Sequence, residues 1–176
     1  IESSKAFAKE VMLAAGVPTA ASGTFNDLAA ALGYIDRHPE PLVVKASGLA
    51  GGKGAVVCSN RADARKTVRA MLEGDQFGAA GRTVVIEAFL EGEEISVLGL
   101  TNGLDVELLP VAQDHKRLLE GDKGPNTGGM GAYGPVALAT PDLLDRVLRE
   151  VFHPTLEQMQ RQGAPFSGVL YAGLMV

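Results

Sequence analysis

The sequence contains one cysteine, Cys58, among its 176 residues. A single cysteine excludes a disulfide framework within the chain and is typical of a reducing compartment, so we expect a cytoplasmic location. No apolar run reaches the roughly 18 residues that a membrane-spanning helix needs, and the first residues lack the pattern of a signal peptide. The three histidines are scattered along the chain and do not form the grouping of a metal site.

The sequence also lacks any block of basic residues. With a net charge of −5 and dispersed lysines and arginines, neither nucleic acid nor an anionic membrane is an expected partner. The apolar fraction of 46% is sufficient for a hydrophobic core, and the length allows one domain or two small lobes. The chain does not begin with Met, and its last residues, 169–176, are an apolar run. We therefore expect a piece of a longer protein.

Helical and strand patterns alternate along the chain. Capping residues and apolar periodicity predict helices over residues 5–15, 28–37, 61–73 and 141–162, the last one bent near His153 and Pro154. Strands are predicted over residues 42–45, 55–58, 83–87, 94–100, 105–111 and 166–176. The glycine-rich segment 112–135 is predicted to be a long functional loop. Frequent hairpins favour the α+β class.

The most informative segment is residues 42–57, in which an apolar strand delivers Lys45 and a glycine-rich loop carries Lys53. Backbone N–H groups and ammonium groups in this arrangement are suited to binding phosphates. The segment is not a P-loop, because Ser47 stands where that motif requires its first glycine and a strand follows where it requires a helix. A flexible hairpin with two solvated lysines is the alternative.

A second segment, residues 87–96, joins the end of one predicted strand to the start of the next. An extended linker of this kind can offer backbone C=O and N–H groups to the edge of an adenine ring. A carboxylate seven residues after Glu87, that of Glu94, can accept hydrogen bonds from two ribose hydroxyls. The alternative is a turn with four solvated carboxylates, and Glu91 and Glu93 fit that description.

Taken in order, these features resemble the ATP-grasp superfamily and, within it, the family of glycinamide ribonucleotide synthetases (phosphoribosylamine–glycine ligases). The resemblance covers nearly the whole chain and rests on SKAFAK at 4–9, KASGLAGGKG at 45–54, QDHKR at 113–117, GPNTGGMGAY at 124–133 and LYAGLM at 170–175. It implies an α+β, ATP-grasp fold with two lobes, the second incomplete. A leading helix and connection would occupy residues 1–20, a small lid lobe 21–88, and the incomplete C-terminal lobe 89–176.

The resemblance also implies site residues. The nucleotide would be bound by Lys5, Lys45, Gly51, Gly52, Lys53, Gly54, Glu87, Ala88, Phe89, Leu90 and Glu94. The catalytic candidates beside the acceptor are Asp114, His115, Lys116 and Arg117, and the substrate loop is Asn126, Thr127, Gly128, Gly129, Met130 and Gly131. The basic residues would hold a phosphate or steady an acyl phosphate, and Asp114 would orient the attacking amine. Two roles stay open for His115, general base and structural brace, and an ordinary exposed lysine is the alternative for Lys5.

The reaction implied by the resemblance joins glycine to 5-phosphoribosylamine through a glycyl phosphate, with ATP as the phosphoryl donor and Mg²⁺ as cofactor. The metal ligands are expected beyond Val176 and the N-terminal lobe before Ile1, so we expect no turnover by this chain alone. Two alternatives remain: another ATP-grasp carboxylate–amine ligase, and a nucleotide-binding module without catalytic activity.

Overall fold

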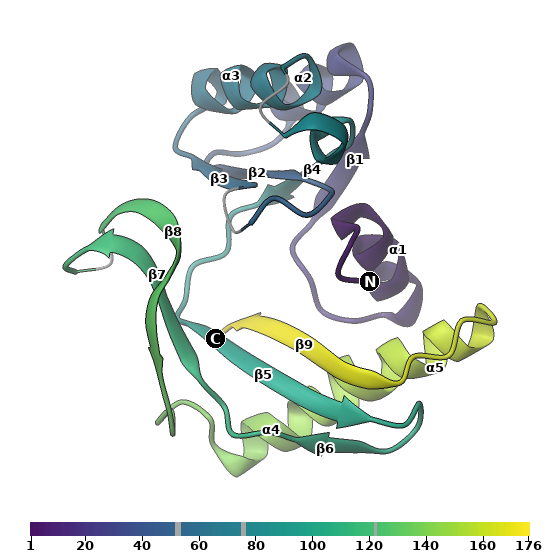
Figure 1. Ribbon diagram of the computed structural model, residues 1–176. Helices are drawn as coiled ribbons and strands as arrows, with labels where there is room; N and C mark the ends of the chain where they lie inside the picture. Colours follow the sequence, from purple (N-terminus) through teal and green to yellow (C-terminus); the bar gives the residue numbers. More distant parts are fainter. Residues whose placement is uncertain (52–53, 75–76, 122) are drawn as a thin grey trace. The chain divides into compact units, whose positions relative to one another are not determined.

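A computed structural model describes residues 1–51, 54–74, 77–121 and 123–176 (Figure 1). The chain divides into two compact units, one of residues 1–10 and 20–90 and the other of residues 11–19 and 91–176. Helices and antiparallel sheets occur in both units, which confirms the predicted α+β class. None of the helices in the described ranges is long and apolar enough to cross a membrane.

The first unit is built on a four-stranded antiparallel sheet with the strand order β1-β4-β2-β3. Its strands are β1 (Ser22–Phe25), β2 (Leu42–Ala46), β3 (Ala55–Cys58) and β4 (Val84–Ala88). Its helices are α2 (Leu28–Arg37), α3 (Arg61–Leu72) and the short 3₁₀ helix η1 (Gly78–Gly81), together with the first turns of α1 (Lys5–Ala15).

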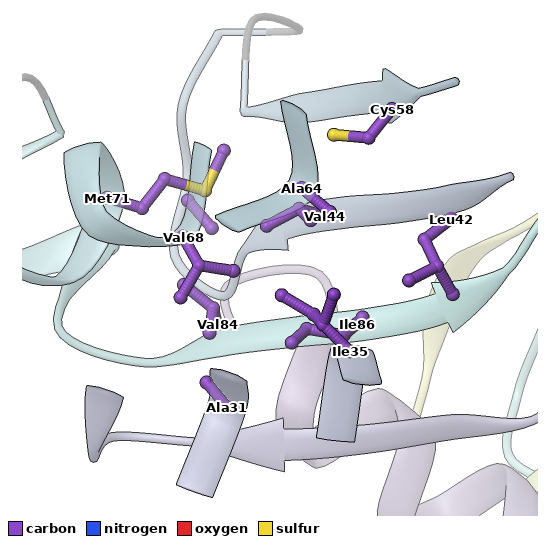
Figure 2. Packing of buried hydrophobic residues seen from close by; sticks show 11 residues of the cluster. Ala31, Ile35, Leu42, Val44, Cys58, Ala64, Val68, Met71, Val84 and Ile86 are labelled. Carbon is purple, nitrogen blue, oxygen red and sulfur yellow. The ribbon is translucent and has the colours of Figure 1, made fainter. Parts of the chain in front are cut away.

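The core of the first unit lies between the sheet and helices α2 and α3 (Figure 2). Leu42, Val44 and Ala46 alternate along β2 toward this core, where they meet residues such as Ile35 and Val68. Because successive side chains of a strand point to opposite faces, this alternation leaves Lys45 on the other face of the sheet. The core packing therefore determines where the first candidate lysine projects.

The second unit contains a three-stranded antiparallel sheet with the order β6-β5-β9. Its strands are β5 (Glu94–Thr101), β6 (Val106–Leu108) and β9 (Gly168–Met175), and its helices are α4 (Pro141–Val147) and α5 (His153–Arg161), joined by the π-helical turn η2 (Leu148–Phe152). The turn provides the predicted irregularity before Pro154. Phe152 packs on the sheet at Gly99, where an added Cβ would lie 2.6 Å from a ring carbon.

A two-stranded antiparallel hairpin, β7 (Gln113–Leu119) and β8 (Lys123–Tyr133), occupies the segment that we predicted to be a long loop. That prediction is wrong. Glycine and proline density suggested irregular structure, but the backbone groups pair across the hairpin, and several glycines lie in an irregular stretch of β8 rather than in a loop. The catalytic candidates of residues 114–117 are consequently held on a strand.

Candidate functional site

Ser47 fixes the N-terminus of α1 on the end of β2. Its carbonyl oxygen accepts the backbone N–H of Lys5 at 2.8 Å, and its hydroxyl accepts the N–H of Ala6 at 3.1 Å. These bonds satisfy two of the N–H groups that a helix start leaves without partners. The Lys5 Nζ in turn donates to the carbonyl oxygen of Gly48 at 3.0 Å. Lys5 is thus held at the start of the glycine-rich loop.

The side chain of Glu87 forms a buried cluster with two lysines, which we call the Glu87 cluster (Lys9, Lys45 and Glu87). Its two carboxylate oxygens lie 2.6 Å from Lys45 Nζ and 3.2 Å from Lys9 Nζ. The Glu87 side chain is 9% exposed and that of Lys9 7%, whereas that of Lys45 is 29% exposed. One buried acid therefore holds two ammonium groups, and of these the Lys45 group has the greater access to solvent.

Burial lowers the pKa of Lys9, an effect that the charge of Glu87 opposes. The pKa of Lys5 is also lowered, first by burial and then by the positive charge of Lys45. Lys9 additionally donates to the carbonyl oxygen of Ala20 at 3.1 Å. The interaction with Lys45 shows that the described lysines of this face share one electrostatic environment.

The glycine loop between β2 and β3 is described in part. Gly51 has a φ of +57°, which disfavours any residue with a Cβ, and an added Cβ at Gly54 would lie 2.5 Å from the Cβ of Ala50. The carbonyl oxygen of Gly54 accepts the N–H of Ala46 at 2.8 Å, which closes the loop. The predictions for Gly52 and Lys53 lie outside the described residues.

The connector that was predicted to bind adenine begins at the end of β4. The N–H of Ala88 donates to the carbonyl oxygen of Ala21 at 2.9 Å, so this donor is used within the protein. The side chains of Phe89 and Leu90 are partly exposed, and the boundary between the two units falls after Leu90. The structure thus places these residues at the junction of the units.

In the second unit the structure joins two candidates that the sequence assigned to different groups. Lys116 Nζ donates to the Glu94 carboxylate at 2.5 Å, so the predicted ribose acid and a predicted catalytic lysine form an ion pair. Burial acts to lower the pKa of Lys116, but the hydrogen bond to Glu94 and the nearby Tyr171 and Asp114 raise it above its ordinary value. The Lys116 ammonium therefore stays charged.

Lys116 faces an irregularity in the hairpin ladder. Between the pairs His115–Gly131 and Arg117–Asn126, β7 has one residue and β8 has four, residues 127–130. The Thr127 hydroxyl donates to the carbonyl oxygen of Lys116 at 2.9 Å and accepts the N–H of Gly129 at 3.0 Å. Thr127 therefore replaces ladder bonds that the bulge interrupts.

Only some of the glycine positions of β8 require a residue without a Cβ. Gly129 has a φ of +115°, and an added Cβ would lie 3.3 Å from the Asp114 carboxylate, whereas nothing lies within 4 Å of an added Cβ at Gly128 or Gly131. Met130 is exposed. Among the residues predicted to form a substrate loop, Thr127 and Gly129 thus have structural reasons that the sequence did not show.

His115 and Arg117 lie on the other side of β7 from Lys116. The His115 ring stacks on Tyr133 with centroids 5.6 Å apart and an interplanar angle of 17°, while Tyr133 donates to the side chain of Gln113. Arg117 Nη1 donates to the carbonyl oxygen of Gly124 at 2.6 Å. These contacts are of the kind that a bracing role for His115 requires.

The acidic side chains of the described residues do not form a metal-binding cluster. In the described ranges no three side chains of His, Cys, Asp or Glu come together in a way that could hold an ion. Two acids of the candidate site pair with lysines instead: Glu87 with Lys9 and Lys45, and Glu94 with Lys116. The described donor set suits anionic and polar ligands better than a bare cation.

The whole chain is similar in sequence to known ligases and to a trifunctional protein. The family model of the phosphoribosylglycinamide synthetase ATP-grasp (A) domain matches residues 3–176. A phosphoribosylamine–glycine ligase from Ralstonia nicotianae is 51% identical over the whole chain, which corresponds to 42% of that protein. A trifunctional purine biosynthetic protein, adenosine-3, from Gallus gallus is 50% identical over the whole chain and 18% of its own length.

The fold of the chain is also similar to that of a solved structure. The crystal structure of a phosphoribosylamine–glycine ligase from Thermotoga maritima is similar with a TM-score of 0.90 and 36% sequence identity, over 99% of this chain and 44% of that one. The chain thus spans less than half the length of each of these relatives.

Proposed function

The chain belongs to the phosphoribosylglycinamide synthetase family and contains its ATP-grasp domain, and from this premise we propose that it is the ATP-grasp region of a ligase for glycine and 5-phosphoribosylamine. In this reaction a phosphoryl group passes from ATP to the glycine carboxylate, giving glycyl phosphate and ADP. The amine of 5-phosphoribosylamine then attacks the acyl carbon, and phosphate leaves with formation of glycinamide ribonucleotide. The observation that carries the proposal is the match of residues 3–176.

The residues that we propose for phosphate binding belong to the first unit. The Lys45 side chain has access to solvent, and its ammonium forms an ion pair with the buried Glu87 carboxylate. The ammonium is therefore positioned before any phosphate binds. Lys5 lies at the start of the same loop and provides a second positive charge. We assign Lys53 the same role by its place in the motif. Gly51, Gly52 and Gly54 would let the backbone approach phosphate oxygens closely.

The connector and the second unit would bind the rest of the nucleotide and the acceptor. Residues 87–90 would contact adenine mainly through backbone groups, and Glu94 would accept hydrogen bonds from ribose hydroxyls with the oxygen that Lys116 leaves available. Asp114 would bind a substrate amine. Lys116 and Arg117 would hold anionic groups of the substrates, and His115 would brace the hairpin.

Mg²⁺, when bound, would neutralise the negative charge that develops on the phosphates during the transfer. As the family resemblance implies, we propose that its ligands lie beyond Val176. The two units would then act as the lid lobe and part of the C-terminal lobe of a larger enzyme.

The test is ADP release from MgATP in the presence of glycine and freshly generated 5-phosphoribosylamine. This chain and the protein encoded by the whole gene are assayed side by side, with circular dichroism as the control for folding. We expect ADP release that requires both glycine and the amine, from the gene-length protein only. ADP release with another amino acid would indicate a different carboxylate–amine ligase, and nucleotide binding without release would indicate a binding module.

A further inference from the structure

The motif LYAGLM at residues 170–175 has no role in the function proposed so far. It lies in β9, which pairs with β5 along its whole length (Figure 1). Leu170 and Ala172 are buried against the interior of the second unit, whereas the side chain of Tyr171 is 52% exposed. Tyr171 and Gly173 therefore lie on the open face of this sheet.

Gly173 makes room for the Tyr171 ring. A Cβ added at Gly173 would lie 2.8 Å from the Tyr171 hydroxyl and 3.3 Å from two of its ring carbons. The ring consequently lies along its own strand, over residue 173, and its hydroxyl reaches the Ser96 hydroxyl at 3.4 Å. The Tyr-x-Gly spacing of the motif thus has a geometric reason, because any larger residue at 173 would displace the hydroxyl.

The open face carries candidate residues from neighbouring elements. Ser96 lies opposite Gly173 in the β5–β9 register, and Glu94 lies two residues before Ser96 on the same face. The N–H of Ser96 donates to the carbonyl oxygen of Ala112 at 2.7 Å, and this bond brings the start of the hairpin beside β5. Lys116 then extends from the hairpin to Glu94.

The Tyr171 hydroxyl is available to a ligand. A separation of 3.4 Å makes its bond to Ser96 a weak one, which a stronger charge-assisted bond can replace. The Lys116 ammonium has three N–H donors, of which Glu94 takes one. The hydroxyl contacts Ser96 and the ammonium contacts Glu94, two residues apart on one face of β5, so the two donors can serve one carboxylate.

The negative charges near these two donors disfavour an isolated phosphate as the ligand. Glu94 and Asp114 contribute two negative charges near the one positive charge of Lys116. A zwitterion matches this arrangement, because its ammonium can meet Asp114 while its carboxylate meets the donors. Asp114 and Lys116 are two residues apart on one face of β7, so their Cα atoms are separated by roughly 6–7 Å, a span suited to a small amino acid between them.

We propose that Tyr171 is a substrate-binding residue whose hydroxyl, together with the Lys116 ammonium, holds the carboxylate of a small amino-acid substrate, while Asp114 holds its ammonium group. The proposal rests on the proposed function and assigns the residues that bind the substrate glycine. Gly173 and Ser96 act as positioning residues, since they set where the Tyr171 hydroxyl lies.

The test compares Tyr171→Phe with the wild type, both as gene-length proteins. Phenylalanine keeps the ring over Gly173 and removes only the hydroxyl. We expect the KM for glycine to rise about tenfold or more, the usual effect of losing a hydrogen bond to a charged group, with the KM for MgATP changed less than about twofold. Val169→Ala is the matched control, because Val169 lies on the same strand and face and is exposed.

A second variant tests the geometry. Gly173→Ala displaces the hydroxyl without removing it, so we expect the same rise in the KM for glycine. The Tyr171→Phe/Gly173→Ala double variant should be little worse than either single one, since both changes remove one contact. An unchanged KM for glycine in Tyr171→Phe, or an equal rise for MgATP, overturns the proposal.

Calorimetry of glycine binding in the presence of MgADP separates this proposal from the proposed function. Glycine that binds the wild type but not Tyr171→Phe supports the subsite, even when no ADP is released. Ligase activity that survives in Tyr171→Phe with unchanged glycine affinity supports the function and refutes the subsite. Failure of the wild type to bind glycine refutes the subsite directly.

Discussion

Replacing Glu87 with glutamine tests the buried Glu87 cluster at its centre. The substitution keeps the shape of the side chain and removes the charge that holds Lys9 and Lys45. Lys9 would keep its bond to the carbonyl oxygen of Ala20 but lose its counter-charge in a site where its side chain is only 7% exposed. Lys45, with its 29% exposed side chain, can turn toward water.

The expected loss follows from this difference in burial. Removing one partner of a fully buried ion pair costs about 3–5 kcal/mol. Because Lys45 can reach solvent and Lys9 keeps a carbonyl partner, we expect about 2–3 kcal/mol here. With a urea dependence of about 2 kcal/mol per molar, the unfolding midpoint should fall by about 1–1.5 M.

The assay is urea unfolding of the chain followed by circular dichroism, with Glu91→Gln as the control because Glu91 is exposed. The control should stay within about 0.5 kcal/mol of the wild type. The Lys9→Met/Glu87→Gln double variant should lose less than the sum of its single variants, because the uncompensated buried ammonium is then gone. A midpoint shift under about 0.3 M for Glu87→Gln at an unchanged slope would falsify the assignment of a buried, stabilising cluster.

Three further outcomes are expected. Burial lowers the pKa of Lys9 below the ordinary 10.5, so on raising the pH the folded protein loses this proton before the unfolded chain does. The unfolding free energy of the wild type should therefore rise relative to that of Lys9→Met as the pH increases toward 10.5. A constant difference between the two proteins from about pH 8 to about pH 10 would contradict this. Thr127→Val should speed amide hydrogen exchange in β7 and β8, by loss of about 1 kcal/mol, whereas Thr127→Ser should not. The Cys58 thiol, 1% exposed and with a pKa raised by burial, should react with a disulfide reagent at pH 8 at least about 100-fold more slowly than in urea, and equal rates would refute its burial.

Local signals were sufficient for most helices and strands. Helices α1 and α2 begin and end at the predicted residues, because Ser4 and Asp27 cap their first turns through bonds to nearby N–H groups. Strands β2 and β3 were predicted for the same kind of reason, since each contains a short apolar run, residues 42–44 and 55–58, next to proline or glycine.

Strand β1 was not predicted, because what holds it is distant in sequence. Its four residues, Ser22–Phe25, include a glycine and give no period-2 signal of their own. They pair with Val84–Glu87 of β4, more than fifty residues later in the chain. Gly23 is required because an added Cβ would lie 2.6 Å from the Phe25 ring and 2.9 Å from that of Tyr34, a restriction that only the fold creates.

The candidate site was predicted by residue type more completely than by role. The motif singled out Lys45 and Glu94 as site candidates, which stays a prediction, and nothing local showed that each would pair with a charge from another element. Lys9 was missed as a member of the site. Its spacing of four residues from Lys5 on one helix, and the single acid that ends the apolar run of β4, are the signals that could have revealed it.

In the proposed site, Lys45 and Lys116 would bind anions although each is paired with an acid. A buried or half-buried ammonium without a counter-charge would tend to lose its proton, and with it the ability to bind an anion. For Lys116, burial acts to lower the pKa but the hydrogen bond to Glu94 helps to raise it, so this ammonium keeps its proton. Glu87 and Glu94 each leave ammonium donors of their lysine partners that they do not use. The acids thereby orient the lysines before a substrate arrives, so less reorganisation is required when it binds. Glu94→Gln should therefore weaken substrate binding through a mobile Lys116, as well as through loss of the ribose contact that we propose for Glu94, and Lys116→Met should reproduce the first effect without the second.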